Sequence, residues 1–141
     1  LSEDKKIKLI QLLSEFSGEK GLLLGQYIDL SSSNTKLEER IKLNKLKTGM
    51  LMSFCCQSVA ICAGKSKKIE KSLADIGMYI GEIFQINDDF EDFPNMPAKN
   101  KKFLQNYKLK LSKKIFSSFK KINLKNKKTF LLIEFLLDLK V

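Results

Sequence analysis

The chain has 141 residues, of which 43% are hydrophobic, so it is long and apolar enough to form one modest folded domain. No apolar run approaches the roughly 20 residues that a membrane-spanning helix needs, which argues against a transmembrane protein. The formal net charge is +10, and all of the basic excess follows residue 93. A single Arg against 25 Lys nevertheless disfavours a nucleic-acid partner, because bidentate contacts to bases and phosphates favour Arg.

Three cysteines, Cys55, Cys56 and Cys62, do not make a disulfide framework, and the chain has no His to complete a zinc site with them. We interpret them as buried thiols in a reducing compartment, and we expect a cytoplasmic protein. The first six residues do not have the composition of a signal peptide.

Apolar residues recur with helical spacing along the whole chain, and no strand-like alternation accompanies them. We therefore expect one all-α domain over residues 1–141, folded as a helical bundle. The helices expected in chain order cover residues 3–30, 37–63, 68–93, 98–121 and 125–140. Polar, Gly-containing or Pro-containing segments separate the first four of these helices.

Two short motifs precede the third expected helix. In Gly25-Gln-Tyr-Ile-Asp29, Gln26 and Asp29 are three residues apart and share a helix face, either as a polar helix end or as part of a site. Lys47 and Thr48 stand side by side before Gly49, where they could donate to two oxygens of one diphosphate. Taken alone, such a Lys-Thr pair is more often a solvated surface feature.

A polar stripe of Gln85, Asp88, Asp89 and Asp92 lies at the end of the third expected helix. Its carboxylates repel one another and face the negative end of the helix dipole, so a cation would compensate for them. Carboxylate oxygens without nearby His or Cys suit Mg²⁺, which also takes water and the phosphates of a ligand. The alternative is an ordinary acidic, solvated helix end.

In this order, the three motifs resemble those of the trans-isoprenyl diphosphate synthases, with the closest likeness to bacterial-type farnesyl diphosphate synthases. The resemblance extends from about residue 5 to residue 93. It implies the C-terminal half of the isoprenoid synthase fold. It also implies a Mg²⁺-dependent prenyltransferase that condenses an allylic diphosphate with isopentenyl diphosphate.

The resemblance further implies roles for individual residues. Asp88, Asp89 and Asp92 would hold the metal, and Lys47 and Asp88 would be catalytic. The residues expected to bind substrate are Gln26, Asp29, Lys47, Thr48, Gln85 and Lys102. Lys102, or else Lys99 or Lys101, would replace the lysine of a Gly-Lys loop that is not recognisable here. We expect Gln26, Lys47, Gln85 and Asp88 to converge on one cavity.

A first aspartate-rich motif, which the resemblance places before Leu1, is not part of this sequence. We therefore expect a fragment or truncated chain, inactive by itself, whose function requires a homodimer or a heteromeric partner. Two hypotheses follow from this departure. The chain is the C-terminal half of a prenyltransferase, or it is a non-catalytic helical subunit or degenerate copy that binds a true synthase.

Overall fold

The computed structural model describes residues 1–31, 36–123 and 131, and within these residues it contains helices and no strand. The helices in chain order are α1 (Glu3–Ser17), α2 (Leu22–Ser31), α3 (Leu37–Asn44), the π-helical turn η1 (Lys45–Gly49), α4 (Met50–Cys62), α5 (Lys67–Asp92) and α6 (Ala98–Lys121). The prediction of an all-α fold is confirmed. The helix expected over residues 125–140 lies outside the described residues, apart from the single position Leu131.

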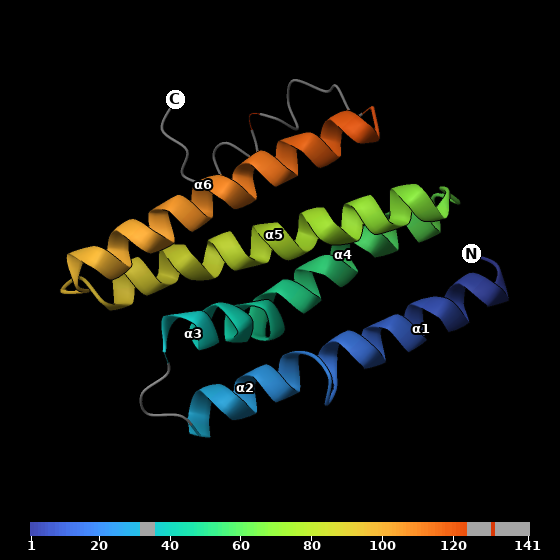
Figure 1. The fold of residues 1–141 in the computed structure, drawn as a ribbon. Coiled ribbons are helices and arrows are strands. Elements are labelled where there is room, and N and C mark those ends of the chain that lie inside the picture. The colour runs from blue at the N-terminus through green and yellow to red at the C-terminus, as the bar shows by residue number, and fades with distance from the viewer. Residues whose placement is uncertain (32–35, 124–130, 132–141) are drawn as a thin grey trace.

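Helix α5 is the central helix of the bundle (Figure 1). It packs against α6 on one side and against α4 and η1 on the other. Helix α1 packs against α4, and α2 packs against η1, so both lie on the far side of α4 and η1 from α5. This order of layers places η1 between α2 and the C-terminal part of α5.

The apolar core lies between α5 and α6. Helix α5 contributes Ile76, Ile83 and Ile86, and α6 contributes Leu104, Leu111, Ile115 and Phe119, all of them buried. Each such side chain stabilises the fold by roughly 1.5–3 kcal/mol when it leaves water. The connection between the two helices is short and contains Pro94 and Pro97, which cannot continue α5. The sequence therefore placed both helices within one residue of their observed bounds.

The expectation of one helix over residues 3–30 is wrong, because the helix is interrupted between α1 and α2. Gly18 is extended, with φ −82° and ψ −153°, and its N–H bonds to the carbonyl oxygen of Ser14. A Cβ atom at Gly21 would overlap the carbonyl oxygen of Phe16, so the turn leaves room only for glycine at that position. The two glycines thus end one helix and begin another.

The second expected helix, over residues 37–63, contains a change of helix type. Residues Lys45–Gly49 form a π turn between α3 and α4. A π turn adds one residue to the turn and thereby rotates the side chains around it, and such turns often occur at functional sites. Lys47 and Thr48 lie within this turn.

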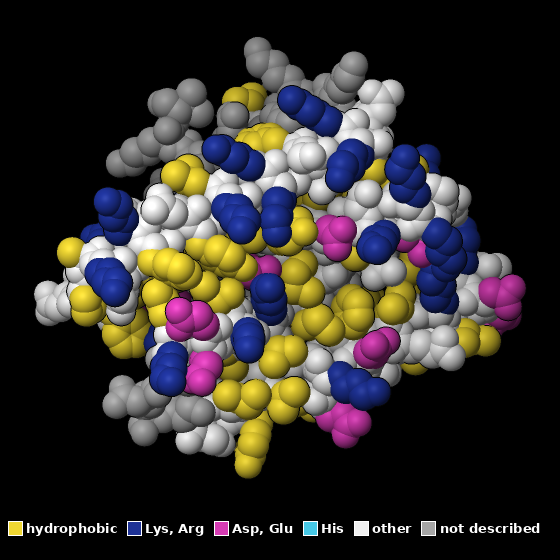
Figure 2. Space-filling view, in the orientation of Figure 1, with side chains coloured by type: hydrophobic (Ala, Val, Ile, Leu, Met, Phe, Trp, Pro, Cys, Tyr) yellow, Lys and Arg dark blue, Asp and Glu magenta, His cyan; other side chains and the backbone are white. Residues whose placement is uncertain are grey.

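Large apolar side chains are exposed on α1 and α2. Helix α1 buries none of its residues, and the exposed apolar side chains on the two helices are Ile7, Ile10, Leu13, Leu23, Leu24, Tyr27 and Leu30. In Figure 2, hydrophobic side chains form a band across the middle of the face that continues to its lower edge, and Lys side chains spread over the upper part, where α6 lies. Among the described residues, no helix combines the length and the apolar character that a membrane span requires.

The three cysteines are free thiols, but the expectation that they are buried is wrong. Cys55 and Cys62 are exposed, and Cys56 is half-buried. Helix α4 is apolar around most of its circumference, so its composition does not reveal which face packs against α5.

Candidate functional site

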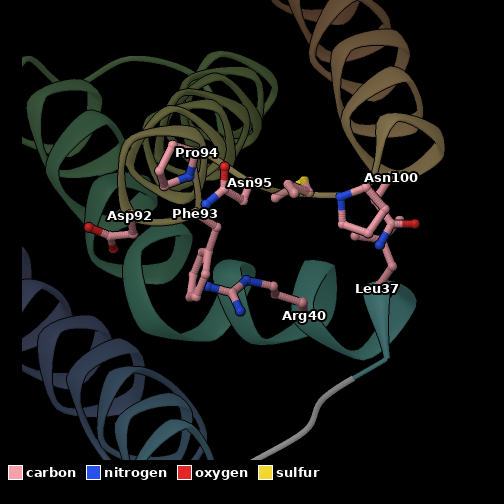
Figure 3. A pocket seen from close by; sticks show the side chains of 9 residues that line it. Leu37, Arg40, Asp92, Phe93, Pro94, Asn95 and Asn100 are labelled. Atoms are coloured by element: carbon pink, nitrogen blue, oxygen red, sulfur yellow. The ribbon is translucent and has the colours of Figure 1, made fainter.

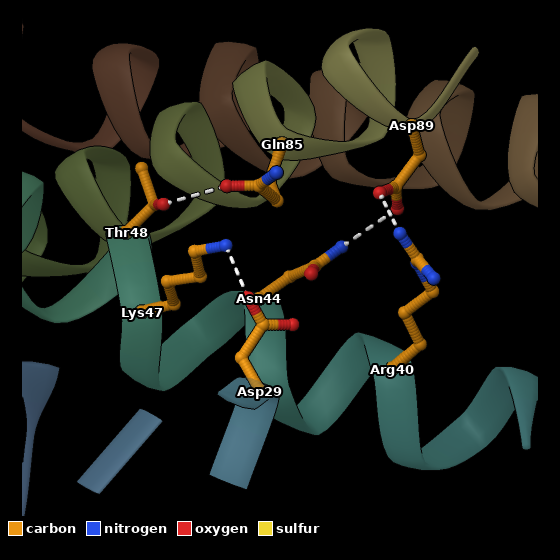
Figure 4. Close-up of polar contacts among 7 residues, drawn as sticks. All are labelled: Asp29, Arg40, Asn44, Lys47, Thr48, Gln85 and Asp89. Atoms are coloured by element: carbon orange, nitrogen blue, oxygen red, sulfur yellow. Dashed lines mark hydrogen bonds and ion pairs between the residues drawn. The ribbon is translucent and has the colours of Figure 1, made fainter. Parts of the chain in front are cut away.

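The first two motifs meet where α2 crosses η1. Lys47 Nζ donates to Asp29 Oδ2 at 2.5 Å (Figure 4). Gly25 permits this crossing, because a Cβ atom there would lie 2.6 Å from the backbone nitrogen of Lys47. The two side chains are 30% and 35% exposed, so this ion pair is only partly buried.

The second and third motifs meet where η1 crosses α5. Thr48 Oγ1 donates to Gln85 Oε1 at 2.9 Å, and both side chains are half-buried. One turn earlier on α5, a Cβ atom at Gly81 would lie 2.7 Å from the Cα atom of Gly49. The two backbones touch at these glycines, and this contact brings the threonine hydroxyl within reach of the glutamine.

The three aspartates of the expected metal site do not share one environment. Asp89 is 1% exposed, with Oδ1 accepting from Arg40 Nη2 at 2.7 Å and Oδ2 accepting from Asn44 Nδ2 at 3.3 Å. Asp88 is half-buried and Asp92 is exposed. Neighbouring residues on a helix are about 100° apart, so Asp88 and Asp89 face different sides of α5.

No group of three His, Cys, Asp or Glu side chains in the described part of the chain is arranged to hold a metal ion. The structure therefore separates Asp89 from the two aspartates with which the sequence grouped it. Metal binding itself stays a prediction.

The pKa of Asp88 is raised above its ordinary value, first by burial and then by repulsion from Asp92, Glu91 and Asp89. The charge of Lys47 acts in the opposite direction and lowers this pKa. A cation bound between Asp88 and Asp92 would relieve the repulsion. Two carboxylates are also a donor set that Mg²⁺ accepts when water and ligand phosphates complete its shell. The residues present therefore fit a shared metal site.

The remaining expected site residues are less closely connected. Gln26 is half-buried on α2, one turn before Asp29, and Lys102 is exposed near the start of α6. Within the described residues, no hydrogen bond or ion pair joins either side chain to the group around Lys47. Their roles in substrate binding stay predictions.

Sequence reasoning missed Arg40 and Asn44, the two partners of Asp89. The available signal was the single Arg of the chain with an Asn four residues later, on one helix face. The pKa of Arg40 is raised, chiefly by its hydrogen bond to Asp89 and further by the charges of Asp89, Asp29 and Asp92, while burial opposes the shift. Arg40 therefore pairs with a carboxylate of α5 at the edge of the expected metal site.

A cavity of about 420 Å³ opens beside this cluster, at the end of α5 (Figure 3). Its lining residues are Leu37, Arg40, Asp92, Phe93, Pro94, Asn95, Met96, Pro97 and Asn100. The guanidinium of Arg40 stacks on the ring of Phe93, 4.6 Å from the ring centre. The four residues expected to share one cavity are not among those that line this one, so their convergence stays a prediction.

Comparison with known proteins connects these motifs to one family. The chain matches the family model described as Polyprenyl synthetase over residues 1–132. It is 34% identical over 136 residues to the farnesyl diphosphate synthase of Buchnera aphidicola subsp. Acyrthosiphon pisum, an alignment that covers 93% of this chain and 48% of that protein. It is 34% identical over 103 residues to the farnesyl diphosphate synthase of Haemophilus influenzae, which covers 70% of this chain and 35% of the relative.

Solved structures agree with these sequence relatives. A putative farnesyl-diphosphate synthase from Marinomonas sp. MED121 superposes with a TM-score of 0.81 at 27% identity, over 95% of this chain and 53% of that one. A geranyltransferase from Legionella pneumophila superposes with a TM-score of 0.78 at 26% identity, over 98% of this chain and 51% of that one. The chain thus spans about half the length of the proteins it matches. The resemblance first indicated by the three motifs is confirmed: this chain belongs to the polyprenyl synthetase family.

Proposed function

We propose that this chain carries the diphosphate-binding part of a prenyltransferase that condenses an allylic diphosphate with isopentenyl diphosphate, as farnesyl and geranylgeranyl diphosphate synthases do. The observation that carries the proposal is the meeting of three helices around Lys47. Its ammonium group contacts Asp29 of α2, and the adjacent Thr48 contacts Gln85 of α5. An ammonium group in this position could also donate to a phosphate oxygen of a bound diphosphate.

Each side chain has a defined task in this proposal. Lys47, Thr48 and Gln85 donate to the allylic diphosphate, and Asp29 holds Lys47 in place before the ligand binds. Asp88 and Asp92 hold Mg²⁺, which supplies positive charge to the departing diphosphate when it is bound. Asp89 supports this pair from within the fold, and Gln26 and Lys102 complete the binding surface.

We further propose that residues 1–141 do not catalyse the condensation by themselves. The chain spans about half the length of its relatives, and α1 and α2 expose apolar faces that a complete enzyme would cover. The carbocation that forms when an allylic diphosphate ionises also needs a site closed to water. Activity therefore requires a second polypeptide or segment, in a homodimer or with a different partner. This second part would add metal-binding carboxylates and helices that close the substrate cavity. The free thiols fit a cytoplasmic setting.

A second candidate is a non-catalytic subunit that binds a true synthase. Two observations favour it: Asp89 is already neutralised by Arg40, and only residues 93–97 connect α5 to α6. Such a short connection leaves little length for a Gly-Lys loop that would contact phosphate. Loss of diphosphate binding with retained partner binding would distinguish this candidate from the enzyme.

Titration calorimetry with inorganic pyrophosphate, with and without Mg²⁺, tests the proposed site. We expect binding that requires Mg²⁺, its loss in Asp88→Ala, and weaker but still Mg²⁺-dependent binding in Lys47→Ala. Asp75→Ala is the matched control, because Asp75 is an exposed aspartate on the same helix and outside the site. Equal affinity with and without Mg²⁺, or an Asp88→Ala variant that binds normally, would contradict the proposal.

A further inference from the structure

Arg40 contacts the end of α5 at two separate points. Its Nη2 donates to Asp89 Oδ1 at 2.7 Å, and its guanidinium plane lies over the ring of Phe93, the residue that follows α5. Asp92, one turn after Asp89, lines the same cavity as Arg40 (Figure 3). Arg40 therefore joins α3 to the last turn of α5, beside the hydrogen bond from Asn44 to Asp89.

The contact is difficult to explain by stability alone. A buried ion pair contributes little net stability, since well-packed apolar residues often replace one without loss. Here the pair also leaves Arg40 Nε buried without a hydrogen-bond partner among the described residues. A buried, unsatisfied donor is uncommon and costs free energy. This arrangement indicates that the contact serves the neighbouring carboxylates.

We propose that Arg40 is a positioning residue for the metal-diphosphate site, an inference that rests on the function proposed above. By neutralising Asp89 and packing on Phe93, Arg40 fixes the last turn of α5 and with it the positions of Asp88 and Asp92, the two residues that would hold Mg²⁺. Arg suits this task better than Lys, because its planar guanidinium can donate to a carboxylate and stack on an aromatic ring at once.

The test measures the Mg²⁺ concentration that gives half-maximal binding of inorganic pyrophosphate, by calorimetry at fixed pyrophosphate. Residues that orient metal ligands typically change metal affinity 10–100-fold when they are replaced. We expect Arg40→Leu to raise the half-saturating Mg²⁺ concentration by about 10-fold or more. Arg40→Lys, which keeps the charge and loses the planar fork, should restore part of the difference.

Arg40→Leu leaves Asp89 buried without its cation, and this variant is at risk of unfolding. The double variant Arg40→Leu/Asp89→Asn removes that unpaired charge and should fold, while the raised Mg²⁺ requirement persists. Lys8→Leu is the matched control, because Lys8 pairs at 2.6 Å with the buried Glu70 near the other end of α5. It should leave the half-saturating Mg²⁺ concentration within about twofold of wild type, since loss of a helix–helix ion pair alone does not reach the metal ligands.

The results separate this inference from the function on which it rests. The role of Arg40 would be overturned, and the proposed function would stand, if the folded double variant kept the wild-type Mg²⁺ requirement. The same conclusion would follow if Lys8→Leu raised the half-saturating Mg²⁺ concentration as much as Arg40→Leu does. Wild-type protein that fails to bind pyrophosphate with Mg²⁺ would overturn the proposed function, and this inference with it.

Discussion

The substitution Gly81→Ala is the sharpest test of how the bundle builds its site. On helix propensity alone it should stabilise α5 by up to about 1 kcal/mol, since Gly is the poorest helix former after Pro. The structure predicts the opposite sign. The new Cβ atom would lie 2.7 Å from Gly49 Cα and 3.0 Å from the carbonyl oxygen of Thr48. Both are backbone atoms that cannot rotate away.

The magnitude follows from three contributions. Overpacking of a close contact costs typically about 1–3 kcal/mol, which exceeds the gain in propensity. Separation of α5 from η1 would also stretch the Thr48–Gln85 hydrogen bond, worth about 0.5–1.5 kcal/mol. We expect a net loss of about 1–3 kcal/mol in the free energy of unfolding.

Urea unfolding followed by circular dichroism measures this loss directly, and in thermal unfolding it corresponds to a fall of about 3 °C per kcal/mol. Ser117→Ala on the exposed face of α6 serves as the control for propensity, because it adds a better helix former without a close neighbour. Pyrophosphate binding by Gly81→Ala should weaken together with stability. A variant more stable than wild type would refute the inference that the two backbones touch at this crossing.

Two further predictions concern buried groups. Burial raises the pKa of Glu82 above its ordinary 4.5, so its ionised form destabilises the folded state at neutral pH. Glu82→Gln should therefore raise the unfolding midpoint at pH 7, by a margin that shrinks as the pH falls from 7 towards about 4.5, and an equal margin at pH 4 and pH 7 would contradict the shift. Cys55 and Cys62 should be alkylated by iodoacetamide faster than Cys56, because burial raises the pKa of the Cys56 thiol. Mass spectrometry of timed samples measures this order, and a Cys56 that reacts first would contradict it.

The sequence by itself determined the parts of this protein that depend on local chemistry. The apolar spacing and the prolines at 94 and 97 placed α5 and α6 within one residue of their observed bounds. The three motifs also indicated the family that the comparisons confirm. These signals are local, because helical periodicity and helix breaking depend on residues only a few positions apart.

Tertiary structure alone decided which partners the polar side chains meet. The sequence grouped Asp89 with Asp88 and Asp92, yet Asp89 turns to Arg40 and Asn44, which lie 49 and 45 residues earlier in the chain. The break between α1 and α2 and the π turn around Lys47 likewise escaped the local pattern. The physical reason is that the facing partner of a helical side chain depends on where neighbouring helices cross. These crossings depend on close backbone contacts at Gly25, Gly49 and Gly81, which no local periodicity encodes.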